Sequence, residues 1–451
     1  MEGKRVNKIK SKNTWICGLL GIVLLIKTLI LINALPQPDV FKSSDSEAYY
    51  YAATSFLKTG DFLQRSDPVT FPSTDALKIS FPTTERLHHF SIGFPFYLAL
   101  IFFIFGSGTF GQFMALFILT ALGTIALPLL AGDLLRKMNA SPVLQISAIL
   151  GVACWPASFV MCTYGLSEQL TIILLTLLVW LIAPMTFQRR SIGFIRASLA
   201  GLTAGMLNLT RAEFTPVVFL IMMLPVIGYF TNRSNDRFSL SLMVNLFFPL
   251  FLIAIAAAIP VVRNYRAFGE IIPFTSAGGE TLWLATIHSD SFGFSGPNRN
   301  VFLTCYVPGK PGATDKKFKE TAMMNVIKRP AYYLEGMVQR FIGINCTSFG
   351  EPAVRGRPVY VYLWRMLLRL SQLLVIVGFA FGLFIYRKTE PLFALCIFLI
   401  YSYKYLFLHV VYNGVPRMFY PFYPLALVFA LCGAEALVMG YRNKSWKSAS
   451  P

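Results

Sequence analysis

Charged residues are scarce in this chain, and acidic residues are the scarcest of them. Only 14% of the 451 residues are charged, with 21 acidic against 40 basic side chains, while 55% are hydrophobic. This balance excludes an ordinary soluble enzyme. The formal net charge of +19 would suggest nucleic acid in a soluble protein, but here the basic residues gather at the ends of apolar runs. We therefore expect membrane lipids as partners and no nucleic acid.

Cysteine is sparse and lacks a recognisable pattern. The seven cysteines include no Cys-x-x-Cys pair, and most fall inside or beside apolar segments. They read as small packing residues, so we expect neither a zinc site nor a disulfide framework, and no cofactor. Internal repeats, low-complexity stretches and flexible linkers are also absent from the sequence. The expectation is one polytopic domain over residues 1–451.

Long apolar runs dominate what is present. They predict an all-α membrane protein with about ten transmembrane helices. The stretch 91–106, "SIGFPFYLALIFFIFG", is short for a span and has Pro95 near its start, so we read it as a juxtamembrane or re-entrant helix. The predicted spans are 15–35, 110–134, 143–163, 166–184, 195–211, 213–230, 238–262, 361–386, 391–411 and 419–440.

Basic residues set the predicted topology. The N-terminus and the turns near 136, 189, 233, 387 and 442 are all basic, which places both termini in the cytoplasm by the positive-inside rule. Residues 36–109 and 263–360 are then extracytoplasmic loops, the second with a helix over 316–341 interrupted near Pro330. The first apolar run reads as a retained helix, with a cleaved signal peptide ending near Ala34 as the alternative.

The first loop contains a predicted amphipathic helix over 45–59. Ser44 and Glu47 form a Ser-x-x-Glu capping box, Tyr49 begins an apolar face at helical spacing, and Gly60 suits a C-terminal cap. We expect this helix to lie on the outer membrane surface with Asp45 in its first turn. Asp45 either serves a site there or only complements the helix dipole, and Glu47 reads as a capping residue.

The stretch "DSEAYYYAATSFLKTGDF", residues 45–62, resembles the first extracytoplasmic loop of a family of membrane glycosyltransferases. This family, the C superfamily that uses polyprenyl- or dolichyl-phosphate sugars, includes protein mannosyltransferases and lipid A aminoarabinose transferases. The shared pattern is Asp-x-x-x-Tyr, small apolar residues, then Leu-x-x-Gly-Asp. Further similar fragments are "GFPFYLALIFFIFG", "YGLSEQL", "LTRAE", "RNYRAFGEIIPFTSAGGETLW" and "PRMFYPFYPLALVFA".

The resemblance implies that Asp45 belongs to an active site. It also brings two departures from the family pattern. Some members carry an adjacent Asp-Glu pair, whereas Ser46 separates the two acids here. Other members have a lysine before Pro-Pro where this chain reads Gly93-Phe94-Pro95, so a phosphate-binding lysine is missing there. We expect His88, His89 or Arg86 to bind the phosphate in its place.

The chemistry of such a donor assigns roles to these residues. Phosphate is a good leaving group, so the enzyme needs a base for the acceptor and cations for the phosphate. Asp45 is the candidate base. Glu168 holds the acceptor or orients Asp45, or it is only an N-terminal acid of its helix next to Ser167. The candidate donor-phosphate-binding residues, each also readable as an interfacial or snorkelling cation, are His89, Arg211, Arg263, Lys404 and Arg417.

The sequence thus predicts a hexosyl- or pentosyltransferase. It would move a sugar, with inversion, from a polyprenyl-phosphate donor to a lipid, glycan or protein acceptor at the extracytoplasmic face of a bacterial inner membrane. The alternative class is a secondary transporter or flippase. Transporters tend to show repeats and midplane polar residues, whereas here the unusual polar residues gather at one face. A lipid-linked oligosaccharide ligase is a further alternative among enzymes.

Overall fold

The computed structural model shows a chain built almost entirely of helices. It describes residues 2–34, 44–64, 85–87, 90–187, 193–231, 240–273, 275–287, 301, 304–346, 359–389, 391–403 and 422–448. Within these ranges the strands are limited to β1 (Leu63–Gln64) and β2 (Glu85–Arg86), which pair antiparallel with Leu63 opposite Arg86. The predicted all-α class is therefore confirmed.

The helices follow the apolar runs and the polar segments between them. Over the first half of the chain they are α1 (Glu2–Ala34), α2 (Ser44–Thr59), α3 (Gly93–Phe105), α4 (Thr109–Ala121), the π-helical turn η1 (Leu122–Ala126), α5 (Leu127–Lys137), α6 (Pro142–Ala153), α7 (Pro156–Met161), α8 (Ser167–Phe187), α9 (Phe194–Thr210), the 3₁₀ turn η2 (Ala212–Phe214) and α10 (Thr215–Thr231). The second half contains α11 (Leu240–Phe268), α12 (Gly278–Thr286), α14 (Pro311–Lys328), α15 (Pro330–Cys346), α16 (Val359–Thr389), α17 (Pro391–Ile400) and α19 (Tyr423–Ser448).

Six helical segments of the described chain are long and apolar enough to cross a membrane, and the protein is an integral membrane protein. They are Thr14–Ala34, Thr109–Lys137, Pro142–Phe159, Ser167–Pro184, Phe247–Phe268 and Arg369–Arg387. Each of the ten predicted spans overlaps a described helix, but the count of ten stays a prediction. Helix α3 has 13 residues and is therefore about 20 Å long. This is less than the hydrocarbon thickness of about 30 Å, which agrees with a segment that does not cross.

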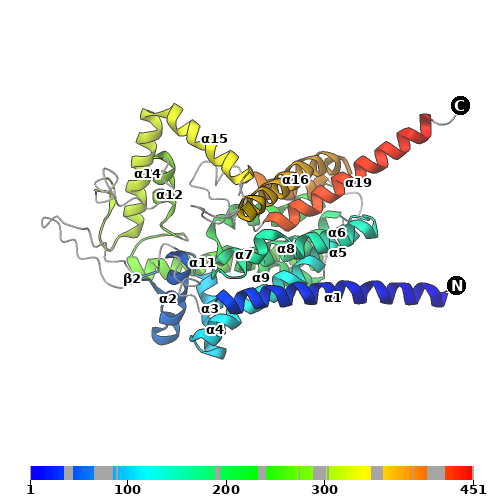
Figure 1. Ribbon diagram of the computed structural model, residues 1–451. Helices are drawn as coiled ribbons and strands as arrows, with labels where there is room; N and C mark the ends of the chain where they lie inside the picture. The colour runs from blue at the N-terminus through cyan, green and yellow to red at the C-terminus, as the bar shows by residue number, and fades with distance from the viewer. Residues whose placement is uncertain are drawn as a thin grey trace.

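The long helices run alongside one another, and the chain ends lie together. Figure 1 shows α1 (blue) and α19 (red) projecting at the same end of the bundle, where both termini are found. Helices α2, α12 and α14 and strand β2 lie at the opposite end. This arrangement is the one expected when both termini face one side of the membrane, and it gathers the two predicted extracytoplasmic loops at the other side.

Helix α1 is part of the folded bundle. Its Leu31 is fully buried in the main apolar core and its Lys27 is 2% exposed. Other α1 side chains, such as Leu25 and Leu29, are more than half exposed, as expected for a helix with one face toward lipid. The choice between a retained helix and a cleaved signal peptide stays a prediction.

The second predicted loop forms a small helical unit. Trp283 of α12 packs on Phe318 of α14, with ring centroids 5.2 Å apart. Asp315 accepts a hydrogen bond from the Gly279 backbone N–H at the start of α12. The expected helix over 316–341 is present as α14 and α15, and it breaks at Arg329, directly before Pro330, because proline cannot donate the backbone hydrogen bond of a continuing helix.

Candidate active site

Helix α2 places Asp45 at its head and ends where the sequence predicts. Asp45 and Glu47 lie in the first turn, and Gly60 closes the helix with φ of +76°, a left-handed conformation that glycine adopts without strain. The apolar face of α2 is buried against protein: Ala52 and Ala53 are fully enclosed. The predicted helix is confirmed. Its apolar face was expected to lie on the membrane surface, but in the structure it packs against α3 and β1 of the same chain.

The start of α3 fits between α2 and the end of α9. A side chain at Gly93 would bring its Cβ within 2.5 Å of the Thr210 nitrogen, so only glycine allows this approach. Phe94 stands edge-on to Tyr49 of α2, with ring centroids 5.1 Å apart. Ser91 accepts a hydrogen bond from the backbone N–H of Ala212 at 3.2 Å. The "GFPFY" fragment thus positions α2 against the segment that contains Arg211.

Arg211 lies between two carboxylates directly after α9. Its Nη1 is 3.3 Å from Oε1 of Glu168, and its Nε is 2.9 Å from Oε1 of Glu213. The Glu168 side chain is 3% exposed and that of Arg211 is 11% exposed. Burial strengthens the attraction between the two charges because little water screens it. Glu168 therefore occupies the first turn of α8 as a carboxylate held by a buried arginine.

Tyr49 is the point where these groups meet. The pKa of its hydroxyl is raised, first by burial and then by the nearby carboxylates of Asp45 and Glu168. Arg211 and a side-chain hydrogen bond with Ser167 act in the opposite direction. The structure thus brings Asp45, Glu168 and Arg211 around one buried tyrosine. We call Asp45, Tyr49, Glu168 and Arg211 the Tyr49 cluster.

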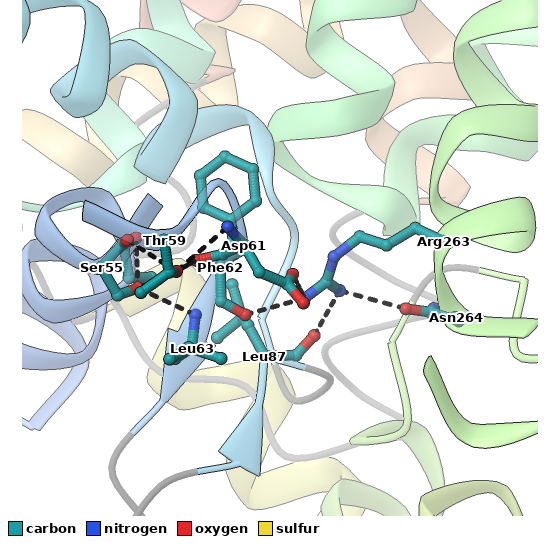
Figure 2. Close-up of polar contacts among 9 residues, drawn as sticks. Ser55, Thr59, Asp61, Phe62, Leu63, Leu87, Arg263 and Asn264 are labelled. Carbon is teal, nitrogen blue, oxygen red and sulfur yellow. Dashed lines mark hydrogen bonds and ion pairs between the residues drawn. The ribbon is translucent and has the colours of Figure 1, made fainter. Parts of the chain in front are cut away.

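Arg263 lies elsewhere, beyond the far end of α2. Figure 2 shows its guanidinium directed at the junction between α2 and the small sheet. It donates to the carbonyl oxygens of Leu87 at 2.6 Å and Phe62 at 2.8 Å, and its Nη2 is 3.4 Å from Oδ1 of Asp61. Asp61 is separated from Asp45 by the length of α2, about 24 Å at 1.5 Å per residue. These contacts make Arg263 an anchor of the sheet.

The other predicted cations are placed as follows. His89, Lys404 and Arg417 lie outside the described residues, so their phosphate-binding role stays a prediction. Of the two predicted cations that the structure describes, Arg211 is the one that contacts Glu168.

Three further residues belong to the site region although sequence reasoning gave them no role. They are Tyr49, Ser167 and Glu213. A signal for Tyr49 was available, because it is the tyrosine of the Asp-x-x-x-Tyr pattern. Glu213 stands in the quoted "LTRAE" fragment, but only the fold shows that it contacts Arg211.

The Tyr49 cluster has more acid than base. Glu168 and Glu213 contact the one guanidinium, that of Arg211, and Asp45 lies near Tyr49, as Glu168 and Arg211 do. Asp45 and Glu168 also stand in the first turns of α2 and α8, where the helix N-termini carry partial positive charge. Such an arrangement can take a proton from an incoming hydroxyl or amine and can hold that acceptor by hydrogen bonds. Among the described residues no group of three or more His, Cys, Asp or Glu side chains could hold a metal ion.

Comparison with known proteins shows a likeness in structure alone. No protein-family model and no curated protein matches the chain. The apo structure of the oligosaccharyltransferase of Archaeoglobus fulgidus is similar with a TM-score of 0.50 at 13% identity, covering 97% of this chain and 52% of that one. ArnT from Cupriavidus metallidurans bound to undecaprenyl phosphate gives a TM-score of 0.38 at 12% identity, covering 94% and 78%.

This chain spans about half the length of the oligosaccharyltransferase. At 13% identity the likeness concerns the backbone arrangement and carries no residue role from one protein to the other. It extends over nearly all of this chain and agrees with the fold implied by the "DSEAYYY" resemblance. The chain therefore has the fold of the archaeal oligosaccharyltransferase, an all-α membrane architecture.

Proposed function

We propose that this protein transfers a sugar from a polyprenyl-phosphate-linked donor to a lipid, glycan or protein acceptor, with inversion, at the extracytoplasmic face of the membrane. The observation that carries the proposal is the Tyr49 cluster. It joins the first turns of α2 and α8, and α2 lies at the end of the bundle away from both termini (Figure 1). The fold shared with an oligosaccharyltransferase and the pattern around Asp45 agree with a transferase.

In the proposed reaction Asp45 acts as the general base. Its carboxylate removes the proton from the acceptor hydroxyl or amine as that atom attacks the anomeric carbon from the face opposite the phosphate. The new bond to the sugar forms while the bond between the anomeric carbon and the phosphate oxygen breaks, and polyprenyl phosphate leaves with the electron pair. Attack from the opposite face inverts the anomeric centre. The departing phosphate needs no general acid because it is a stable anion.

Glu168 is proposed to orient the acceptor beside Asp45. Its ion pair with Arg211 at 3.3 Å holds the carboxylate in place, so that it accepts a hydrogen bond in one direction. Arg211 already faces two carboxylates, Glu168 and Glu213. Binding of the donor phosphate is therefore proposed to need further cations, for which His89, Lys404 and Arg417 remain the predicted residues.

A transfer assay in proteoliposomes tests the proposal. The full chain would be supplied with radiolabelled polyprenyl-phosphate hexoses and pentoses and with lipid, glycan and peptide acceptors. We expect transfer of label from at least one donor. Asp45→Asn should lower the rate about 10²- to 10⁴-fold, the usual effect of a lost general base, with donor binding retained.

Glu47→Gln is the matched control for Asp45→Asn. Glu47 lies in the same first turn but is exposed, so its variant should keep the rate within a fewfold of wild type. An Asp45→Asn rate equally close to wild type, at equal expression, would remove Asp45 as the base. Vesicle transport of a lipid-linked substrate without any sugar transfer would replace the proposal by the transporter alternative.

A further inference from the structure

A lysine lies buried among the membrane helices at a cavity that the first turn of α8 also lines. Lys27, on the membrane-spanning part of α1, is 2% exposed. Its Nζ donates to the Ala153 carbonyl at 3.0 Å and to Oγ1 of Thr124 at 3.3 Å, and it stands 4.9 Å from the centre of the Phe159 ring. Within the described part of the chain no carboxylate forms an ion pair with it. Burying an ammonium group in this way is costly, and such residues usually serve a site.

Lys27 faces a small polar cavity. The cavity has a volume of about 20 Å³ and is lined by residues from four helical segments that include Lys27, Thr120, Thr124, Ser158, Cys162 and Gln169. A volume above about 10–15 Å³ admits one water molecule when two to four polar partners surround it. The cavity therefore has the size and the chemistry for a single water.

Two polar atoms at this cavity have no hydrogen-bond partner among the described residues. They are Oγ1 of Thr120 and Oε1 of Gln169, whose residues are 4% and 5% exposed. The amide of Gln169 is oriented because its Nε2 donates to the Met161 carbonyl, which leaves Oε1 as an acceptor. An acceptor left unsatisfied in a buried site destabilises the folded protein, so a partner is expected.

The local backbone also departs from regular helix at this point. Residues Leu122–Ala126 form the π-helical turn η1 between α4 and α5, and Thr124 lies within it, fully buried. A π-helical turn changes the direction of the side chains that follow it, and such turns are frequent at functional sites. Here it brings the Thr124 hydroxyl to the Lys27 ammonium.

We infer that the cavity holds one ordered water that links Lys27 to the first turn of α8. The water accepts a hydrogen bond from Lys27 Nζ and donates to Oε1 of Gln169 and to Oγ1 of Thr120. Gln169 directly follows Glu168 in the first turn of α8. The water link holds this turn through Gln169, while Arg211 holds it through the ion pair with Glu168. Lys27 is thus a positioning residue for Glu168; this second half of the inference rests on the proposed transfer function.

A high-resolution cryo-EM map of the full chain in lipid nanodiscs tests the water site without any assay of activity. Density for one water should appear within hydrogen-bond reach of Lys27 Nζ and Gln169 Oε1. A map that resolves other buried waters but shows an empty cavity would overturn the water site. The map does not depend on sugar transfer. A wild-type protein that transfers no sugar would contradict the proposed function, whereas the water site is contradicted only by an empty cavity in the map.

A double-mutant cycle tests the positioning role. Lys27→Met should lower kcat on the order of ten- to a hundredfold through misplacement of the α8 turn, with KM for the donor nearly unchanged. In a Glu168→Gln background the same change should have no further effect, because the group that Lys27 positions is already lost. An equal loss in both backgrounds would mean that Lys27 only supports the fold. Thr28→Val is the matched control, since the hydrogen bond that the described part of the chain shows for Thr28 goes to Leu24 of its own helix, and it should leave kcat unchanged.

Discussion

Two arginines flank α2 and have similar burial but different partners. The side chain of Arg211 is 11% exposed and that of Arg263 is 16% exposed. Arg211 contacts the carboxylates of Glu168 and Glu213, whereas Arg263 donates mainly to the backbone carbonyls of Phe62 and Leu87. The first holds charged groups in place and the second holds a chain segment in place. Position near α2 therefore does not determine what an arginine does; its acceptor atoms do.

The largest effect is expected for Arg211→Met. This change removes the charge beside Glu168 and leaves a buried carboxylate without that partner, which typically costs about 3–5 kcal/mol. We expect a large loss in the free energy of unfolding, measured by thermal or denaturant melting in detergent, together with loss of transfer.

A second variant separates the charge from the fold. Arg211→Met combined with Glu168→Gln removes both charges, so it should recover much of the stability while transfer stays low. A double variant no more stable than Arg211→Met alone would show that the ion pair is not the main stabilising contact of this region.

The next effect is expected for Arg263→Gln. Loss of the charged hydrogen bonds to Phe62 and Leu87 should cost about 2–3 kcal/mol, seen as a lower melting temperature with turnover per folded molecule retained. Arg266→Gln, an exposed arginine on the same helix, is the control and should melt like wild type. If Arg263→Gln instead raised KM for the donor at unchanged stability, Arg263 would bind phosphate as the sequence suggested.

A smaller effect is expected for Gly60→Ala. The left-handed backbone at Gly60, with φ of +76°, costs about 1 kcal/mol for a residue with a side chain. We expect a modest loss of thermal stability and nearly normal transfer, because Gly60 ends α2 at the Arg263 side and not at the Asp45 side. Lys58→Ala, at an exposed position in the last turn, should change less than Gly60→Ala. Equal melting temperatures for the two variants would argue against this turn as a source of stability.

The smallest effect is expected for Glu47→Gln. Surface substitutions of this kind usually change stability by less than about 0.5 kcal/mol. Helicity by circular dichroism and melting temperature should match wild type within error. A marked loss of stability would mean that the predicted capping box contributes more to the stability of α2 than is usual for an exposed side chain such as that of Glu47.

The sequence predicted elements well where one local signal was sufficient. Apolar length gave the long helices, Gly60 gave the end of α2, and Pro330 gave the break between α14 and α15. These features depend on residues close in sequence, so periodicity and backbone preferences reveal them.

Local sequence patterns could not predict the contacts within the site, because the residues that meet there are far apart in the sequence. Tyr49 lies near Glu168 and Arg211, which come from other helices, and Gly93 lets the start of α3 approach the end of α9. Arg263 meets Leu87 across 176 positions of sequence. Such contacts follow from tertiary packing, which spacing within a single helix does not encode, and for this reason the sequence grouped Arg263 with Arg211.

The pairing of β1 with β2 has a consequence for insertions into the chain between them. Leu63 pairs with Arg86 and Gln64 with Glu85, and Arg263 donates to the carbonyl oxygens of Phe62 and Leu87 on either side, so the two strands are held together. The entropy of closing a chain segment grows slowly with its length, by only about 0.6 kcal/mol for each doubling of the number of residues. Insertions between Gln64 and Glu85 should therefore be nearly neutral for the bundle, which makes this position suitable for an affinity tag or a fluorescent reporter.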